Sequence, residues 1–210
     1  MKVFQYVAIV GIVSLFAFNI ISLHSSKKKV ARLSDTVKYL DLSLRKIQSE
    51  QLYLASNFNV SNIHRKLTAA DSIEVYQLTN GKKSFLYNFY NQNITKKELI
   101  IRYTEIGCNA CIDSTFKILK KNKQIADNYH VVVLVDFSSY EYYVKWKKVA
   151  EVDNDIYWVK KGAFPFDIEK GVASYMFVVD KDKSAEAFFI PNSLYADYIE
   201  KYFQILLKST

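Results

Sequence analysis

Proline, glycine and cysteine are all scarce in this chain. Its 210 residues include 2 prolines, 5 glycines and 2 cysteines. So few prolines and glycines argue against a disordered or low-complexity chain, and the 50% of hydrophobic residues are ample for a packed core. Two cysteines fall short of the four ligands of a structural zinc site, although a dimer could supply four thiolates. We predict neither a metal site nor a cofactor.

Positive charge is concentrated in one part of the chain. The net charge is +8, of which residues 24–66 carry +6 and residues 67–210 only +1. A nearly neutral C-terminal part gives little electrostatic support for binding nucleic acid, so we expect no nucleic-acid partner. Basic side chains that follow an apolar segment would instead attract anionic lipid headgroups.

Charge is absent from an N-terminal apolar run. Val3–Leu23 holds 21 residues and is interrupted only by Gln5, Ser14, Asn19 and Ser22. Its length suits a bilayer core of about 30 Å. A cleaved signal peptide is the alternative, but its apolar region usually has about 7–15 residues and ends in a small-x-small site, which Ser22-Leu23-His24 does not provide. No cysteine lies near residue 20, which excludes lipoprotein attachment. We predict a transmembrane anchor over residues 1–24, with the membrane contacted by residues 3–23.

A heptad pattern follows within a basic segment, residues 25–66. Its apolar or register-setting positions alternate spacings of three and four: Val30, Leu33, Val37, Leu40, Leu44, Ile47, Gln51 and Leu54. Such a pattern is typical of a parallel two-stranded coiled coil, in which the polar Gln51 could set the register. The alternative is an amphipathic helix that packs on its own domain. We predict a stalk and hinge over residues 25–66 and a homodimer formed through residues 30–54.

Residues 67–210 alternate between the patterns of strands and helices and are predicted to form one α/β domain. We expect strands at Ile73–Leu78, Ser84–Tyr90, Glu98–Tyr103, His130–Phe137, Tyr175–Asp180 and Glu186–Ile190. We expect helices at Cys108–Lys121, Ser138–Val149 and Asn192–Leu207.

Both cysteines lie in one motif, Cys108-Asn109-Ala110-Cys111, at the junction between a predicted strand and a predicted helix. The start of a helix favours a thiolate because unpaired backbone N–H groups and the helix dipole stabilise negative charge there. Cys108 is the expected attacking thiol, and Cys111 the thiol that resolves a mixed disulfide. The alternatives are a structural disulfide, an inherited motif in a domain that only binds, and metal binding.

The order strand, Cys-x-x-Cys, helix, parallel strand, helix, hairpin, helix resembles the thioredoxin fold over about residues 84–207. It is most similar to membrane-anchored extracytoplasmic bacterial thioredoxin-like proteins. The resemblance implies a central mixed sheet flanked by helices, preceded here by the transmembrane helix and the coiled-coil stalk. It also implies thiol–disulfide exchange with client proteins and a redox partner protein.

Three positions depart from the pattern of that family. Gly107 stands where relatives usually carry Trp, and Arg102 stands where many thioredoxins keep a buried carboxylate. Ser174 occupies the place of a cis-proline that shapes the peptide-binding groove. All three departures favour a non-catalytic membrane protein whose thioredoxin-like domain binds a partner, which is the alternative function.

Several residues near the motif are candidates for supporting roles. Arg102 is expected to lower the pKa of Cys108, whereas Glu105 is a proton acceptor that could also raise that pKa. Ser174, Tyr175 and Trp158 are candidates for a substrate-binding loop; Trp158 falls in a stretch predicted to be irregular.

The sequence gives two conflicting signals about the side of the membrane on which the domain lies. Lys27, Lys28, Lys29 and Arg32 follow the span, and the positive-inside rule alone would keep the domain in the cytoplasm. An N-terminal span directly after Met-Lys usually acts as an export signal, and a cysteine pair is of more use in an oxidising compartment. We therefore predict a single-pass membrane protein with an extracytoplasmic, periplasmic domain.

Overall fold

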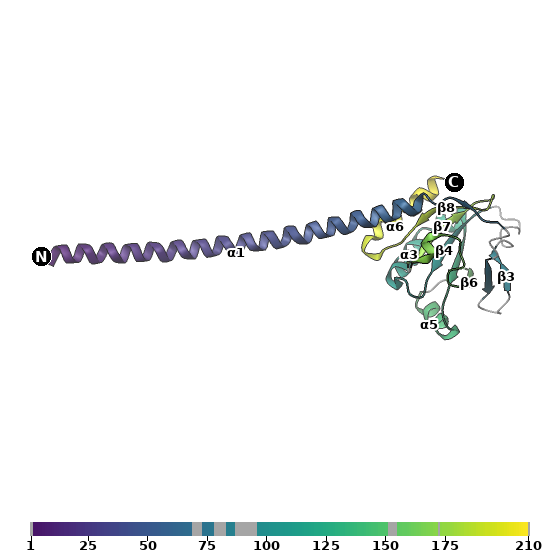
Figure 1. Ribbon diagram of the computed structural model, residues 1–210, viewed down its shortest axis with the longest axis horizontal. Helices are drawn as coiled ribbons and strands as arrows, with labels where there is room; N and C mark the ends of the chain where they lie inside the picture. The colour runs from purple at the N-terminus through teal and green to yellow at the C-terminus, as the bar shows by residue number, and fades with distance from the viewer. Residues whose placement is uncertain are drawn as a thin grey trace. The chain divides into compact units, whose positions relative to one another are not determined.

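The computed structural model describes residues 2–68, 73–77, 83–86, 96–150, 155–171 and 173–209. Within these ranges, side chains are described except for residues 2–10, 12, 13, 83–85, 149 and 150. The chain divides into two compact units, Met1–Leu52 and Tyr53–Thr210. Element labels follow Figure 1.

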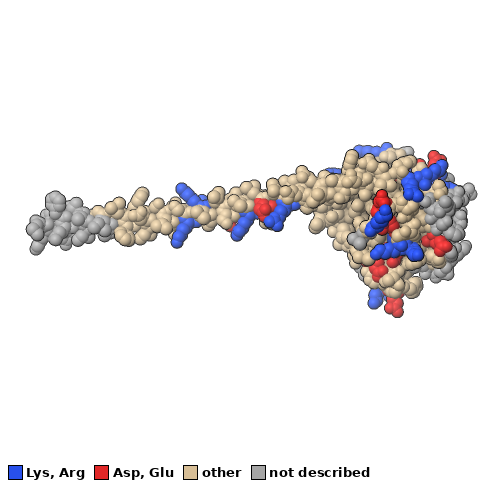
Figure 2. Space-filling model, in the orientation of Figure 1, with Lys and Arg blue, Asp and Glu red and all other residues tan. Residues whose placement is uncertain are grey.

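The first unit belongs to one helix, α1 (Lys2–Ser61), which continues into the second unit. The heptad residues lie on this helix with more than half of each side chain exposed at Val30, Leu33, Val37, Leu40, Leu44 and Ile47. Figure 2 shows basic side chains at intervals along it. The predicted helix is confirmed over residues 30–54, and its pairing with a second copy stays a prediction.

No helix in the described part of the chain has both the length and the apolar character needed to cross a membrane. Many side chains of the predicted span Val3–Leu23 lie outside that part.

The second unit is built on a mixed sheet of eight strands among its described residues, in the order β1-β8-β7-β4-β5-β6-β2-β3. Strands β4, β5 and β6 run parallel, and β7 pairs antiparallel with β4. The other neighbours are antiparallel. The strands are β1 (Arg65–Lys66), β2 (Glu74–Gln77), β3 (Lys83–Phe85), β4 (Lys97–Tyr103), β5 (Tyr129–Val135), β6 (Asp155–Val159), β7 (Tyr175–Val179) and β8 (Ser184–Phe189).

Successive side chains of β4 enter different cores because strand residues alternate between the two faces of a sheet. Leu99, Ile101 and Tyr103 belong to a core that includes residues of the helices α3 (Asn109–Lys121), α5 (Tyr140–Ala150) and α6 (Ala196–Lys208), which are labelled in Figure 1. Ile100 belongs to the core of the other face, which contains Phe164 and Phe166 from the β6–β7 connection. The face with the helices positions the site, because α3 starts directly after β4.

The structure confirms most of the predicted order and corrects part of it. The strand before the motif, the helix after it, the apolar strand β5 and the β7–β8 hairpin all form. The stretch around Trp158, predicted to be irregular, is strand β6. A short helix, α4 (Lys123–Asn128), also forms where none was predicted. The end of the predicted strand Ile73–Leu78 and the end of the predicted strand Ser84–Tyr90 lie outside the described residues.

Candidate active site at the Cys108–Cys111 disulfide

The two cysteines form a disulfide at the start of α3, with an S–S distance of 2.07 Å. Cys108 is the N-cap residue of the helix, and its sulfur accepts a hydrogen bond of 3.2 Å from the Cys111 backbone N–H. Cys108 is exposed, whereas only 4% of Cys111 is exposed. A sulfur that is both accessible and bound by a helix N-terminal donor is suited to exist as a thiolate and to attack first.

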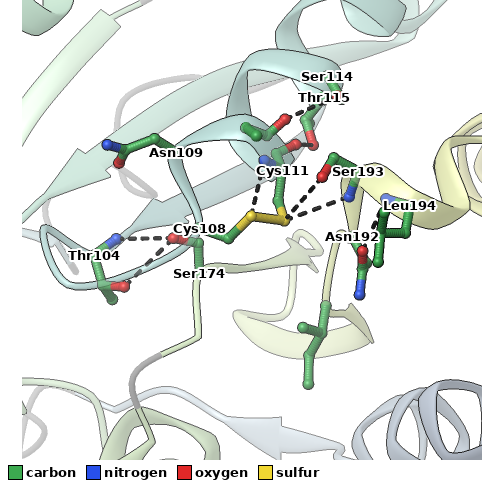
Figure 3. Close-up of a disulfide and its surroundings, with 12 residues drawn as sticks. Thr104, Cys108, Asn109, Cys111, Ser114, Thr115, Ser174, Asn192, Ser193 and Leu194 are labelled. Carbon is green, nitrogen blue, oxygen red and sulfur yellow. Dashed lines mark hydrogen bonds between the residues drawn. A yellow bond between two sulfur atoms is a disulfide. The ribbon is translucent and has the colours of Figure 1, made fainter. Parts of the chain in front are cut away.

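The loop before Cys108 packs tightly against Ser174 (Figure 3). The Ser174 hydroxyl oxygen accepts a 3.1 Å hydrogen bond from the Thr104 N–H. A Cβ atom at Gly107 would lie 2.5 Å from both the Ser174 Oγ and the Thr104 Oγ1. A side chain does not fit there unless this packing shifts, which is the physical reason that glycine precedes Cys108. Ser174 is only 3% exposed, and its described contacts support the loop.

Arg102 is fully buried, and its guanidinium is bound by two carboxylates. Its Nη2 lies 2.9 Å from the Asp136 Oδ2 and 2.8 Å from the Glu169 Oε1. Burial alone would lower the pKa of Arg102, but the hydrogen bond and charges of Glu169, with the charge of Asp136, raise it above its usual value. The charge of Arg102 is therefore balanced by these two partners, and its expected lowering of the Cys108 pKa stays a prediction.

The same carboxylates bind the loops on both sides of Arg102. Asp136 Oδ1 accepts a 2.7 Å hydrogen bond from the Glu105 N–H, in the loop before Cys108. Glu169, in the 3₁₀ helix η2 (Asp167–Lys170), accepts from the Gly162 N–H at 3.1 Å and from the Tyr175 hydroxyl at 2.7 Å. We call Arg102, Asp136, Glu169 and Tyr175 the arginine network. It joins the loop before Cys108 to the β6–β7 connection.

The remaining predicted site residues are placed as follows. The Glu105 carboxylate accepts hydrogen bonds of 2.7 Å from both the N–H and the hydroxyl of Ser138, and its role as a proton acceptor stays a prediction. The Tyr175 side chain is buried in the arginine network, and its expected contact with substrate stays a prediction. Trp158 lies on β6, where its Nε1 donates to the Phe137 carbonyl at 2.9 Å.

Two contacts of the motif involve residues that the sequence did not single out. The Tyr103 hydroxyl donates to the Asn109 Oδ1 within the motif, and burial raises the pKa of Tyr103, which keeps this hydroxyl protonated. On the other side, Ser193 lies against the Cys111 sulfur (Figure 3), with its N–H 3.4 Å away. Ser193 is 82 positions from Cys111 in the chain, so no local pattern could have identified it.

Fold and site together define a thioredoxin-like domain: a Cys-x-x-Cys disulfide lies where a central strand meets a helix, the next two strands run parallel, and an antiparallel hairpin and a helix follow. No family model matches the chain, and no curated protein matches it.

Several solved structures are similar to this chain at low identity. A secreted Mycobacterium tuberculosis disulfide oxidoreductase homologous to E. coli DsbE has 10% identity and a TM-score of 0.44, covering 66% of this chain and 99% of that chain. A putative protein disulfide isomerase from Bacteroides thetaiotaomicron has 13% identity and a TM-score of 0.48, covering 65% and 81%. PrxQ of Xylella fastidiosa has 8% identity and a TM-score of 0.48, covering 71% and 98%. Similarity at this level does not identify the activity of this chain.

Proposed function

We propose that this chain is a thiol–disulfide oxidoreductase whose Cys108–Cys111 pair alternates between a disulfide and a dithiol. One observation carries the proposal: the exposed Cys108 sulfur accepts a hydrogen bond from a helix N-terminal N–H, while Cys111 is buried directly behind it. This asymmetry separates an attacking thiol from a resolving thiol.

The proposed exchange occurs in two steps. The Cys108 thiolate attacks a client disulfide, which forms a Cys108–client bond and releases the first client sulfur as a thiolate. The Cys111 thiolate then attacks the Cys108 sulfur, so that the Cys108–Cys111 bond forms and the second client thiolate leaves. Two electrons pass from the dithiol to the client, and a redox partner protein restores the dithiol by the same chemistry. Run in reverse, the same steps oxidise a client.

A redox titration of the full chain in glutathione buffers tests this function, with both cysteines followed by thiol alkylation. We expect a reversible two-electron couple between about −120 and −270 mV, the range of known disulfide catalysts. Reduction of insulin, used as a model client, should require the dithiol and be lost in Cys108→Ser. A pair that stays oxidised well below about −300 mV would be a structural disulfide. The domain would then be a non-catalytic partner-binding module.

We also propose that residues 3–23 anchor the protein in a membrane and that the domain is extracytoplasmic. The uncharged 21-residue run supports the anchor, and the export tendency of an N-terminal span supports the location. Retention in the membrane fraction after alkaline carbonate washing tests the anchor. Protease access to the domain in intact spheroplasts tests its side, and protection until the membrane is lysed would place it in the cytoplasm.

We propose finally that residues 30–54 form a parallel homodimeric coiled coil. The apolar heptad side chains of α1 are exposed in the single chain, and burial against a second copy would remove them from water. Leu40→Asp, at a heptad position, should shift the detergent-solubilised chain from dimer to monomer in analytical ultracentrifugation. Leu42 is 67% exposed and Leu40 is 58% exposed, but Leu42 lies outside the heptad positions. Leu42→Asp should therefore leave the dimer intact. Equal effects would contradict this dimer.

A further inference from the structure

Ser193 lies at the back of the disulfide, on the side of the buried sulfur. It begins a short 3₁₀ helix, η3 (Ser193–Tyr195), and its backbone N–H donates to the Cys111 Sγ at 3.4 Å. Its hydroxyl oxygen lies 3.9 Å from the same sulfur (Figure 3). Because Cys111 is only 4% exposed, water gives its sulfur little stabilisation, and protein donors must take that role.

The usual structural role of a serine at a helix start is to cap the helix, and here another residue has that role. Asn192 is the N-cap of η3, and its Oδ1 accepts a 2.9 Å hydrogen bond from the Leu194 N–H. The Asn192 carbonyl accepts a further hydrogen bond from the Tyr195 N–H at 3.0 Å. The contact described for the Ser193 hydroxyl is with Cys111, so the capping geometry does not explain it.

We propose that Ser193 is a further catalytic residue, which stabilises the Cys111 thiolate with its backbone N–H and its hydroxyl. This inference rests on the proposed exchange. When the mixed disulfide is resolved, the Cys111 thiolate attacks the Cys108 sulfur and the client sulfur leaves with the electron pair. When the pair is reduced, the Cys108–Cys111 bond breaks and Cys111 receives the electron pair as a thiolate. A nearby donor lowers the pKa of a buried thiol and raises the population of the reactive thiolate in both directions.

The end of helix α1 holds Ser193 in place. Asn57 accepts a 2.7 Å hydrogen bond from the Ile190 N–H and donates to the Ile190 carbonyl at 3.3 Å, and the Tyr53 hydroxyl donates to that carbonyl at 2.9 Å. The Tyr53 ring stacks on Tyr195 with a centroid distance of 4.8 Å. These contacts fix the chain on both sides of Ser193, which makes Tyr53 and Asn57 positioning residues for the Cys111 sulfur.

The test is a pH titration of Cys111 in the full chain, with Cys108→Ser as background so that one thiol remains. Thiolate absorbance at 240 nm is recorded against pH, and the variant lacking both cysteines is subtracted to remove tyrosine absorbance. Adding Ser193→Ala should raise the apparent pKa of Cys111 by about one unit, a roughly tenfold loss of thiolate near neutral pH, because a hydrogen bond to a charged group is lost. Ser193→Thr keeps a hydroxyl and should restore the titration. Asn57→Ala should shift it in the same direction by a smaller amount.

Leu194→Ala is the matched control, because this neighbouring side chain is 83% exposed and should leave the titration unchanged. Thermal unfolding of every variant separates a loss of folding from a shift in pKa. Superimposable curves for Ser193→Ala and its background would overturn the proposal, as would an equal shift in Leu194→Ala. The titration involves no client and no disulfide. If the Cys108–Cys111 disulfide proved too stable to reduce, the proposed function would be wrong, but the result of this titration would be unchanged.

Discussion

A positively charged or titratable side chain lies between two carboxylates at each end of the central strands. At the end that carries the disulfide, Arg102 binds Asp136 and Glu169. At the opposite end of β4 and β5, His130 lies 3.4 Å from a Glu98 oxygen and 3.1 Å from an Asp155 oxygen. The composition of the two clusters is similar, and their burial differs. The arginine side chain is 0% exposed and its partners 2%, whereas His130 and Asp155 are 44% and 59% exposed and only Glu98 is buried, at 3%.

Burial decides what each cluster does. In the arginine network the charge is permanent, since its carboxylates raise the pKa of Arg102 further, and each of the two carboxylates also binds a loop. At the other end, the Glu98 hydrogen bond, opposed by burial and helped by Asp155, raises the pKa of His130 within a partly hydrated cluster. A fixed buried charge suits the end where a reactive loop must be held in one geometry. A solvated histidine tolerates changes of pH with little effect on the fold.

The largest effect is expected from removing the buried cation. Arg102→Met leaves the carboxylates of Asp136 and Glu169 buried without compensation, and breaking such a cluster costs about 3–5 kcal/mol of unfolding free energy. The loops before Cys108 and Tyr175 lose their common anchor, so insulin reduction should fall as well. Thermal unfolding of the full chain in a nonionic detergent measures the loss of stability.

The matched variant at the other end is His130→Met, which should have a smaller effect because it leaves one buried carboxylate, Glu98, where Arg102→Met leaves two, and because His130 and Asp155 are solvated. If the two substitutions destabilise the protein equally, burial is not what distinguishes the clusters. Adding Glu169→Gln to Arg102→Met should recover part of the stability, since one uncompensated charge is removed.

The second-largest loss of stability is expected from Gly107→Ala, because the loop before Cys108 is tightly packed. Gly107→Ala would place a Cβ 2.5 Å from the Ser174 and Thr104 side-chain oxygens, and the strain should cost about 1–3 kcal/mol. Gly11→Ala, where a Cβ meets nothing within 4 Å, is the control and should leave the unfolding of the domain unchanged. If Gly107→Ala melts like the wild type, the loop before Cys108 is not held as tightly as the geometry indicates.

A smaller effect is expected from one hydroxyl of the arginine network. Tyr175→Phe removes the 2.7 Å hydrogen bond to Glu169 while keeping the buried ring, and should cost about 1–2 kcal/mol. Burial raises the pKa of Tyr175 well above its usual value, so this hydroxyl stays a donor across the pH range of the fold. Tyr140→Phe on the exposed surface is the control. A neutral result for Tyr175→Phe would mean that Arg102 and the Gly162 N–H satisfy Glu169 without this hydroxyl.

Local features of the sequence predicted the elements that carry the site. The Cys-x-x-Cys pair between an apolar strand and an amphipathic helix placed the disulfide, and the apolar run Val131–Val135 of β5 indicated a buried parallel strand. Strand β6 was missed because five residues rich in aromatic side chains, Asp155–Val159, give little periodicity.

The network around the site could not be predicted because its members are far apart in the chain. Asp136 is 34 and Glu169 is 67 positions from Arg102, so an arginine in a strand beside a cysteine pair was interpreted as a modulator of the nearby thiol. Only the folded sheet brings these side chains together. The same holds for Ser193 and for the close approach of Gly107 to Ser174.

The smallest effect is expected at the exposed end and depends on pH. Because Glu98 and Asp155 raise the folded-state pKa of His130 above its unfolded value of about 6.5, folding favours the protonated form. The resulting stabilisation is fully present below about pH 6.5 and is lost as pH rises through the raised pKa. With His130 and Asp155 both well exposed, solvent screening keeps it under about 1 kcal/mol.

His130→Asn should therefore destabilise the protein slightly more at pH 5.5 than at pH 8.5, because the stabilisation is lost as pH rises through the raised pKa of the wild-type imidazole. Melting temperatures of both proteins at the two pH values measure the difference, and Asp155→Asn should reduce it. Arg102 keeps its charge at both values, so the arginine network contributes no such dependence through its cation. A destabilisation by His130→Asn that is the same at both pH values would show that the ring acts by packing. The contrast between a fixed charge and a titrating one would then have to be abandoned.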